Sequence, residues 1–348
     1  MSFSRFVAFA LFLAVPLATT ASAEAPKKAV PVKVTFVTDW KAQAEHGGFY
    51  YALAAGLYKK AGLDVAIKQG GPSVNTPQLI AAGAVDFAMA SNHFQPLNLA
   101  AAGADAVAVA AIFQKDPQVL ITHPRTDIKS IADIKGKPVM VSDATVSTWW
   151  VWTKSRYGFD DKQIRKYTFN LAPFLTDKNA IQQGYVTSEP YTIATQGKIK
   201  PQVFMLADYG YPGYANFIVA RGKDLRERPA VVKAFVEASL DGWKGYLTGN
   251  AKAANDLIKR DNPDMTDDII AQAIVQMRDR GMVLGGDAAT LGVGAMTDAR
   301  LKEFSDLMKK SKVFDAKLDY AKAFDARFVN KGRGVVAATP AKTPTKTH

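Results

Sequence analysis

The sequence predicts an α/β protein of two lobes, each a mainly parallel sheet flanked by helices. Strand-like and helix-like segments alternate from Val34 onward, and this alternation is typical of α/β folds. The strand-like segments, for example Ala106–Phe113, are continuous apolar runs. Such runs indicate strands that are buried on both faces, as in a parallel sheet. The 348 residues exceed one typical core, and a hydrophobic content of 48% is enough for two.

We expect residues 34–122 to form most of the first lobe. Its clearest helix is predicted over Gly47–Ala61, where Phe49 and Leu53 are spaced for one helical face and Gly62 follows as a C-cap glycine. The other expected elements are strands at Val34–Val37, Leu63–Ile67, Val85–Ala90, Ala106–Phe113 and Gln118–Thr122, and helices at Thr76–Ala82 and Phe94–Ala102.

The second lobe is expected to comprise residues 123–215. Its predicted elements are strands at Pro138–Ser142, Tyr167–Asn170 and Gln202–Leu206 and a helix at Ser147–Tyr157.

From about Asn216 the chain is expected to be helical. Pro229 opens a long amphipathic helix, and further helices are predicted over Asp267–Arg280 and Thr297–Lys310. These helices need a sheet to cover, so we assign 216–330 to the first lobe. The chain then crosses between the lobes twice, near 121–125 and near 210–217. Two crossings make a hinge, and the cleft between the lobes is the natural ligand site.

The two ends of the chain are expected to lie outside the fold. Arg5, the apolar run Phe6–Leu17 and the small residues of Ala21-Ser22-Ala23 predict residues 1–23 as a secretory signal peptide cleaved after Ala23. The run is shorter than the roughly 20 residues that span a bilayer. We expect a flexible leader at 24–33 and a disordered tail at 331–348.

Composition narrows the compartment and the partners. The chain has no cysteine, so it has no disulfide and no lipid-bearing cysteine after the signal, and the periplasm is the expected location. Removing Arg5 and the four tail cations lowers the net charge from +12 to +7. This surplus is spread along the chain and modestly favours an anionic partner. No motif for nucleic acid is recognised, so none is expected as a partner.

The first candidate binding segment follows the first strand, where open α/β sheets bind ligands. Trp40 offers a flat face for stacking beside Asp39. His46 and the backbone N–H of Gly47 are donors that suit an anion or a carbonyl. Two other interpretations stay open: Trp40 could pack in the core and His46 could cap the helix.

The remaining candidates lie at other strand ends and helix starts, beside a rigid turn, and in the return crossing. Each has an ordinary alternative as a turn, a helix cap or hinge packing. They are Ser73 in a Gly-rich loop, Ser91 and Asn92 after a strand, Ser142, Thr145 and Ser147 before a helix with three tryptophans, Glu189 and Tyr191 beside Pro190, and Tyr214 in the return crossing.

No catalytic constellation is present in the sequence. There is no nucleophilic cysteine, and none of the four histidines has metal-ligand spacing with another. Carboxylate pairs such as Asp160/Asp161 stand at expected helix starts, where they complement the helix dipole. We therefore expect no catalytic residue, no metal and no cofactor.

Three segments carry a family resemblance. They are 39–65 (with Asp39-Trp40 and His46–Tyr50), 78–88 and 130–139. The pattern over 34–330 resembles the type II periplasmic binding proteins of ABC importers. It is most similar to the branch that binds thiamine-pyrimidine precursors, riboflavin, and aliphatic sulfonates or taurine. Glu189-Pro190 falls where relatives carry a comparable Glu-Pro.

The resemblance implies a monomeric receptor that binds a small molecule between its lobes and delivers it to an ABC permease in the inner membrane. Trp40 would stack on a flat heteroaromatic ring, and Glu189 would bond its polar edge. A planar heterocycle of the thiamine-pyrimidine type is favoured. An extended flavin and a sulfonate anion are the alternatives, and a receptor domain that feeds a sensor is a third.

The same branch includes thiamine-pyrimidine synthases, which use pyridoxal phosphate and consume their own histidine. The place of their cofactor lysine reads Ala88-Met89-Ala90-Ser91 here, and their cysteine-rich segment has no counterpart in this chain. His93 lies close to their reactive histidine. The resemblance therefore favours a receptor over an enzyme.

Overall fold

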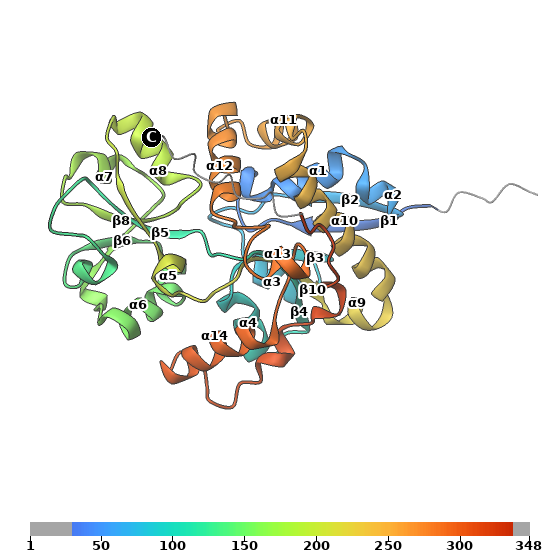
Figure 1. The fold of residues 1–348 in the computed structure, drawn as a ribbon. Helices are drawn as coiled ribbons and strands as arrows, with labels where there is room; N and C mark the ends of the chain where they lie inside the picture. Colours follow the sequence, from blue (N-terminus) through green and yellow to red (C-terminus); the bar gives the residue numbers. More distant parts are fainter. Residues whose placement is uncertain (1–29, 337–348) are drawn as a thin grey trace, which may run out of the picture. The chain divides into compact units, whose positions relative to one another are not determined.

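The computed structural model describes residues 30–336 and contains two five-stranded sheets (Figure 1). The first sheet has the order β2-β1-β3-β10-β4 and the second β7-β6-β8-β5-β9. The strands of the first sheet are β1 Val32–Val37, β2 Leu63–Lys68, β3 Phe87–Asn92, β4 Ala106–Phe113 and β10 Ala215–Arg221. Those of the second sheet are β5 Gln118–Thr122, β6 Val139–Val141, β7 Ile164–Lys166, β8 Ile181–Tyr185 and β9 Gln202–Met205.

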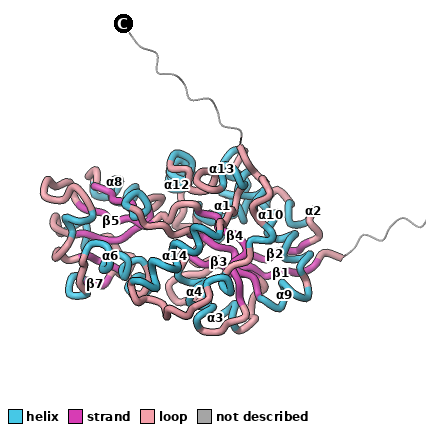
Figure 2. The backbone as a smooth tube through the Cα atoms, turned by 60° about the horizontal axis from the view of Figure 1, so that its bottom comes forward, coloured by secondary structure: helices cyan, strands magenta, loops and turns pink. Residues whose placement is uncertain are grey.

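We call each sheet with its helices a lobe (Figure 2). The helices of the first lobe are α1 Gly47–Ala54, α2 Leu57–Lys60, α3 Thr76–Ala81, α4 Phe94–Ala101, α9 Gly222–Glu227, α10 Pro229–Thr248, α11 Lys252–Asp261, α12 Asp267–Asp279, α13 Ala288–Leu291 and α14 Asp298–Lys310. Those of the second lobe are α5 Asp143–Val146, α6 Trp149–Tyr157, α7 Ala172–Thr176 and α8 Glu189–Gly197. Short 3-10 turns include Ala44–His46 and Leu206–Tyr209.

One strand in each sheet runs against its neighbours. β10 is antiparallel to β3 and β4, and β5 is antiparallel to β8 and β9. Other paired strands, such as β1 with β2 and β6 with β7, are parallel. The expectation of mainly parallel sheets flanked by helices is therefore confirmed, with one reversed strand in each sheet. Both reversed strands directly follow a crossing between the sheets.

The position of the first crossing differs from the expectation. Gln118–Thr122 was expected to end the first lobe, but it forms β5 and pairs with the second sheet. The crossing therefore lies at 114–117 instead of 121–125, whereas the second, at 210–214, falls within the expected range. An apolar run indicates a buried strand but carries no information on which sheet buries it.

Three strand predictions were also wrong. β10 lies at the point where we expected helix from Asn216, and β8 was not foreseen because its Ile-Gln-Gln-Gly-Tyr sequence is polar. Tyr167–Asn170, expected as a strand, is a loop after β7. The helix expected over Gly47–Ala61 is divided at Gly56, whose φ of 68° is left-handed and ends α1. The helices expected after Pro229 are present as α10, α12 and α14.

The aromatic core of the first lobe forms between its sheet and α10. Phe235 of α10 stacks on Phe87 of β3 at 4.1 Å between ring centroids and on Tyr58 of α2 at 5.3 Å. Gly47 and Gly48 let α1 approach the same helix, because a Cβ on either residue would lie 2.0–2.2 Å from the rings of Tyr246 and Trp243 respectively. Close α1–α10 packing therefore depends on these two glycines.

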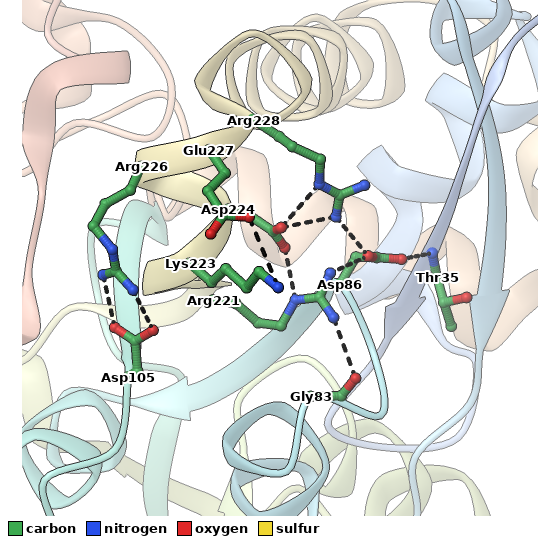
Figure 3. A network of polar contacts seen from close by, with 10 residues as sticks. All are labelled: Thr35, Gly83, Asp86, Asp105, Arg221, Lys223, Asp224, Arg226, Glu227 and Arg228. Carbon is green, nitrogen blue, oxygen red and sulfur yellow. Dashed lines mark hydrogen bonds and ion pairs between the residues drawn. The ribbon is translucent and has the colours of Figure 1, made fainter.

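An ionic network lies at the end of the first sheet where β3 begins and β10 ends (Figure 3). Asp86, just before β3, pairs with Arg221 at 2.5 Å and with Arg228 at 3.0 Å. Asp224 pairs with the same two guanidinium groups at 2.6 and 2.8 Å. The second oxygen of Asp86 accepts the backbone N–H of Thr35 on β1 at 2.8 Å. Two carboxylates and two guanidiniums thus join β1, β3, β10 and the start of α10 with balanced charge.

The described fold extends slightly beyond the expected ends. The signal peptide, the cleavage after Ala23, leader residues 24–29 and tail residues 337–348 lie outside the described residues. β1 begins at Val32, inside the expected leader, and Arg333 of the expected tail pairs with Asp241 at 2.8 Å. Between residues 30 and 336, no helix has both the length and the apolar character to cross a membrane.

Gly48→Ala is expected to destabilise the protein. The added Cβ would lie 2.2 Å from the ring of Trp243, so α1 and α10 must separate or the ring must leave its rotamer, at a cost of about 1–3 kcal/mol. Urea unfolding measures this change. Ala54→Ser, on an exposed position of the same helix, is the control and should change stability by less than about 0.5 kcal/mol. Equal stabilities of the two variants would contradict the packing argument.

Candidate functional site

The candidate site is a pocket of about 180 Å³ lined by both lobes, which we call the interlobe pocket. Its first-lobe residues are Asp39, Trp40, Gln43, Ser91, Asn92 and Gln95. Its second-lobe residues are Gln118, Ser142, Ala144, Thr145, Thr148, Phe169, Gln183, Gly184, Tyr185, Ser188 and Glu189. Most of them stand at or just beyond the carboxyl ends of β1, β3, β6 and β8, where α/β sheets bind ligands.

A larger hollow of about 540 Å³ lies beside α10. It is lined by first-lobe residues only, mainly alanines and charged side chains with Leu57. Specific small-molecule sites have a few convergent polar groups and enclose most of the ligand. The interlobe pocket has convergent polar groups from both lobes, whereas the hollow beside α10 is lined from one lobe only.

Two aromatic side chains from opposite lobes meet at the interlobe pocket. Trp40 follows β1, and Phe169 lies in the loop after β7. Their ring centroids are 4.7 Å apart with an angle of 50° between the planes. Phe169 has a left-handed φ of 61°, unusual for a bulky residue, and its side chain is 46% exposed. Exposed apolar surface held in a strained backbone conformation suits contact with a ligand.

Asp39 presents a carboxylate to the pocket, and a residue outside the pocket fixes the orientation of this side chain. The Nε2 of His46 lies 2.9 Å from Oδ1 of Asp39, and both side chains are largely buried. His46 begins α1 from a 3-10 turn and does not line the pocket. It was expected to touch the ligand, and the structure instead places it as the partner that fixes Asp39.

Glu189 supplies a second carboxyl group from the first position of α8. Its Oε2 accepts the backbone N–H of Tyr185 at 2.7 Å. Burial raises the pKa of Glu189 to about 7, although the N–H of Tyr185 opposes the rise. Gly184 makes room for it, because a Cβ there would lie 2.9 Å from the Cβ of Glu189. Near neutral pH this carboxyl group can accept a hydrogen bond when ionised or donate one when protonated.

Amide side chains complete the polar wall. Gln183 accepts the backbone N–H of Ser142 at 2.7 Å, and Gln95 accepts that of Ser91 at 2.9 Å. These bonds fix the orientation of two hydroxyl-bearing loops. The Oε1 of Gln118 is buried and has no protein partner. A buried acceptor without a partner is costly, so Gln118 is well placed to accept a donor from a ligand.

A contact at Thr187 joins the lobes next to the pocket. The hydroxyl of Thr187 donates to Glu45, and the side-chain amide of Gln272 on α12 donates to the carbonyl of Thr187. Burial raises the pKa of Glu45, even though the hydroxyl bond opposes this rise. Thr187 directly precedes Ser188 and Glu189, so this contact holds the second-lobe wall against the first lobe.

The structure brings together seven of the thirteen residues predicted to bind ligand. These are Asp39, Trp40, Ser91, Asn92, Ser142, Thr145 and Glu189. The other six do not line the pocket: His46, Gly47, Ser73, Ser147, Tyr191 and Tyr214.

Three of the six have a structural role outside the pocket. His46 supports Asp39, and Gly47 packs against Tyr246. Tyr214 is fully buried in the first lobe, where its hydroxyl donates to Asp287. The remaining three, Ser73, Ser147 and Tyr191, are exposed or half-buried at loop or helix positions outside the pocket.

Sequence reasoning missed several lining residues. Those with the most evident role are Gln43, Gln95, Gln118, Phe169 and Gln183. Two signals were available in retrospect. Gln183 interrupts a buried strand with a polar side chain, and Phe169 is an aromatic residue in a segment that is too polar to be a core strand. Gln118 could not be found, because its strand was assigned to the wrong lobe.

The two sheets with their flanking helices form the two-lobed fold seen in periplasmic binding proteins. The structure of the periplasmic aliphatic sulphonate binding protein SsuA from Escherichia coli superposes with a TM-score of 0.64 at 15% identity, covering 85% of this chain and 92% of that one. The model of the family described as NMT1/THI5 like matches residues 43–253. The chain belongs to this NMT1/THI5-like family.

Two relatives are similar in sequence. A formylaminopyrimidine-binding protein from Halalkalibacterium halodurans is 26% identical over 256 residues, which cover 71% of this chain and 75% of that protein. A Haemophilus influenzae protein, provisionally named for thiamine biosynthesis, is 25% identical over 199 residues. The matched region is 55% of this chain and 62% of the Haemophilus protein, so the match spans less than two thirds of that relative.

The stability of the protein is expected to depend on pH through Glu189. Its pKa is about 7 in the folded state and near 4.5 when unfolded, so between these values the folded state holds a proton that the unfolded state has lost. Stability therefore falls as the pH rises from 4.5 to 7. Burial also raises the pKa of Asp116 to about 7, so the titration of Asp116 lowers the stability over a similar pH range.

Glu189→Gln removes one of these two contributions. The free energy of unfolding of E189Q, relative to the parent, should rise by roughly 2 kcal/mol between pH 5 and pH 8. Urea titrations at both pH values measure the difference. Glu227→Gln, an exposed acid on α9, is the control and should follow the parent. Parallel curves for E189Q and the parent would show that Glu189 titrates normally.

Proposed function

We propose that this protein is the solute receptor of an ABC-type importer and binds a small, flat, nitrogen-containing heterocycle of the aminopyrimidine class. The observation that carries the proposal is the interlobe pocket, where Trp40 and Phe169 offer ring faces and Asp39 and Glu189 offer carboxyl groups. The proposal concerns reversible binding, with no bond broken in the solute.

The aromatic pair suits a planar ring. Trp40 and Phe169 belong to opposite lobes, so a ring held against them is in contact with both. Aromatic pairs are worth roughly 0.5–1.5 kcal/mol beyond the burial of their surface. A flat solute therefore gains most binding free energy when the lobes are close together. This difference in affinity would shift the equilibrium from the open toward the closed form.

The polar wall suits the edge of an aminopyrimidine. Carboxylates and the free Oε1 of Gln118 accept N–H donors from an exocyclic amino group. Ring nitrogens need donors, which the amide of Gln183, the hydroxyl of Thr145 and a protonated Glu189 can supply. A carboxyl group with a pKa of about 7 is suited to a heterocycle that presents donors and acceptors side by side.

Charge argues against an anionic solute such as a sulfonate. The interlobe pocket has two carboxyl groups, and its described lining includes no lysine or arginine. A sulfonate beside a carboxylate would be repelled, and proteins usually recognise such anions with arginine or lysine. The similarity to sulfonate-binding proteins supports the fold alone at 15% identity.

Size argues against an extended flavin. A volume of about 180 Å³ is below the roughly 300–1,000 Å³ typical of sites for drug-sized ligands. The pocket accommodates one substituted ring more readily than a three-ring system. The formylaminopyrimidine-binding relative supports the same class of solute.

A receptor is favoured over a synthase of the same family. The described pocket lining holds no lysine for an imine-forming cofactor, and the chain has no cysteine. The signal-like N-terminus and the periplasmic-binding-protein fold support delivery to a permease from the periplasm.

A panel of solutes tests the proposed class. A formylated aminopyrimidine is expected to raise the melting temperature of the mature protein, since ligand at a hundred times its Kd adds about 2.7 kcal/mol to stability. Taurine and riboflavin, tested in the same way, should give no shift. A shift with taurine alone would refute the aminopyrimidine class. Conversion of the solute, followed by chromatography over hours, would refute the receptor.

Trp40→Ala is expected to lower affinity for the aminopyrimidine about 10- to 100-fold, because the loss of one stacking face costs roughly 1–3 kcal/mol. Trp40 is only half-buried, so the fold should persist. Calorimetric titration measures the affinity. Trp40→Phe keeps a ring at this position and should retain most of it. Equal affinities of W40A and the parent would remove Trp40 from the site.

A further inference from the structure

The chain passes between the lobes in two short segments, Phe113 to Gln118 and Tyr209 to Ala215. Each segment can turn only where neither lobe holds it. The hydrogen bonds of the backbone therefore locate the pivots of any lobe movement.

The first pivot is confined to Lys115 and Asp116. On the first-lobe side, the backbone N–H of Gln114 donates to the carbonyl of Met282 at 2.6 Å, and its side-chain amide donates to two further first-lobe carbonyls at 2.9 and 3.0 Å. On the second-lobe side, the carbonyl of Pro117 accepts the N–H of Val186 at 2.9 Å. Only two residues remain between these anchors.

The second pivot lies between Tyr211 and Pro212. The N–H of Tyr211 donates to the carbonyl of Leu206 at 3.1 Å, which holds it to the second lobe. The carbonyls of Pro212 and Gly213 are held instead by Arg300 of α14, in the first lobe.

Arg300 contacts both crossing segments with one guanidinium group. It donates to the carbonyl of Gln114 at 2.6 Å, of Pro212 at 2.9 Å and of Gly213 at 3.2 Å. Its guanidinium carbon lies 3.9 Å from the centroid of Tyr214, and Asp287 pairs with it at 3.6 Å. Hydrogen bonds from a charged donor are stronger than neutral ones, and the planar fork fixes several acceptors at once.

We propose that Arg300 is a hinge clamp that fixes the first-lobe ends of both crossings and thereby sets how far, and how often, the interlobe pocket opens. Without it, the second segment gains free residues as far as Tyr214, and the first loses one of its anchors. Longer free segments give access to more relative orientations of the lobes, and most of these are open. Loss of the clamp therefore shifts the ligand-free protein toward open forms.

Buried polar atoms at both pivots agree with this placement. Oδ2 of Asp116 and the hydroxyl of Tyr211 are buried without a protein partner. The Tyr211 ring contacts Trp152 of the second lobe and Phe304 of the first, at 5.3 and 5.9 Å between centroids. These groups lie where a rotation of the lobes would change their surroundings most.

The inference rests on the proposed function only in treating the pocket as a site that opens, and it can be tested without ligand. Because the chain has no cysteine, spin labels attach only at introduced sites. Val275→Cys on α12 and Lys178→Cys before β8 place one label on an exposed position of each lobe. Double electron–electron resonance then gives the distribution of distances between the lobes.

Arg300→Gln in the labelled protein is expected to lengthen and broaden this distribution. The population at long distances should rise about fivefold, which corresponds to a net difference of one hydrogen bond between the closed and open forms. Arg226→Gln, which removes an exposed first-lobe arginine paired with Asp105, is the control and should match the parent. Arg300→Lys keeps the charge but cannot reach three carbonyls at once, so it should shift the distribution in the same direction by less.

An unchanged distribution in folded R300Q overturns the proposal. If R300Q does not fold, an unchanged distribution in R300K overturns it instead. A lengthening that R226Q shows equally would also overturn it, because the effect would then come from general loss of stability. The absence of aminopyrimidine binding would refute the proposed function without affecting these distances.

Discussion

The site depends on one topological constraint: each reversed strand enters its sheet directly from a crossing. Parallel strands end at one edge of their sheet, and an antiparallel strand begins there. β5 therefore starts at the edge where β6 and β8 end, and β10 starts at the edge where β3 ends. Both crossings lie at these edges, so the polar ends of two sheets meet beside the hinge. Gln118, the first residue of β5, is in the pocket for this reason.

This arrangement concentrates acidic groups where water is scarce, and each is supported by a neighbour. Asp39 receives the imidazole of His46, and Glu189 receives the backbone N–H of Tyr185. A buried carboxylate without such support would become neutral or disrupt the fold. Even with this N–H, burial keeps the pKa of Glu189 near 7. The carboxyl group of Glu189 is therefore a cost to stability near neutral pH, and the proposed aminopyrimidine, with its N–H donors, would recover part of this cost.

Much of the fold could be predicted from the sequence, because continuous apolar runs and helix caps are local signals. β4, α10 and α12 were located within a residue or two. The pairing of strands is not a local property. The sequence of Gln118–Thr122 does not indicate which of the two sheets the strand joins. For the site, polar residues after predicted strands pointed to Asp39 and Ser142, and a carboxylate beside a rigid turn pointed to Glu189; all three line the interlobe pocket. Tyr214 was expected as a ring that the return crossing presents to a ligand, yet it is fully buried in the first lobe, one residue before β10.

The reversed strands also explain why hinge and pocket are difficult to separate in this protein. Gln118 of the pocket lies two residues from the pivot at Asp116, and its backbone N–H donates to the Oδ1 of that carboxyl group at 2.9 Å. On the first-lobe side, Asn92 lines the pocket. The next residue, His93, stacks on Phe304 with 4.0 Å between the ring centroids, and Phe304 belongs to α14, the helix that carries Arg300. A solute that moves Gln118 or Asn92 therefore acts on residues in direct contact with a pivot or with the helix of the clamp. Under the proposed function, packed side chains over a few residues would couple binding to lobe movement without a long-range pathway.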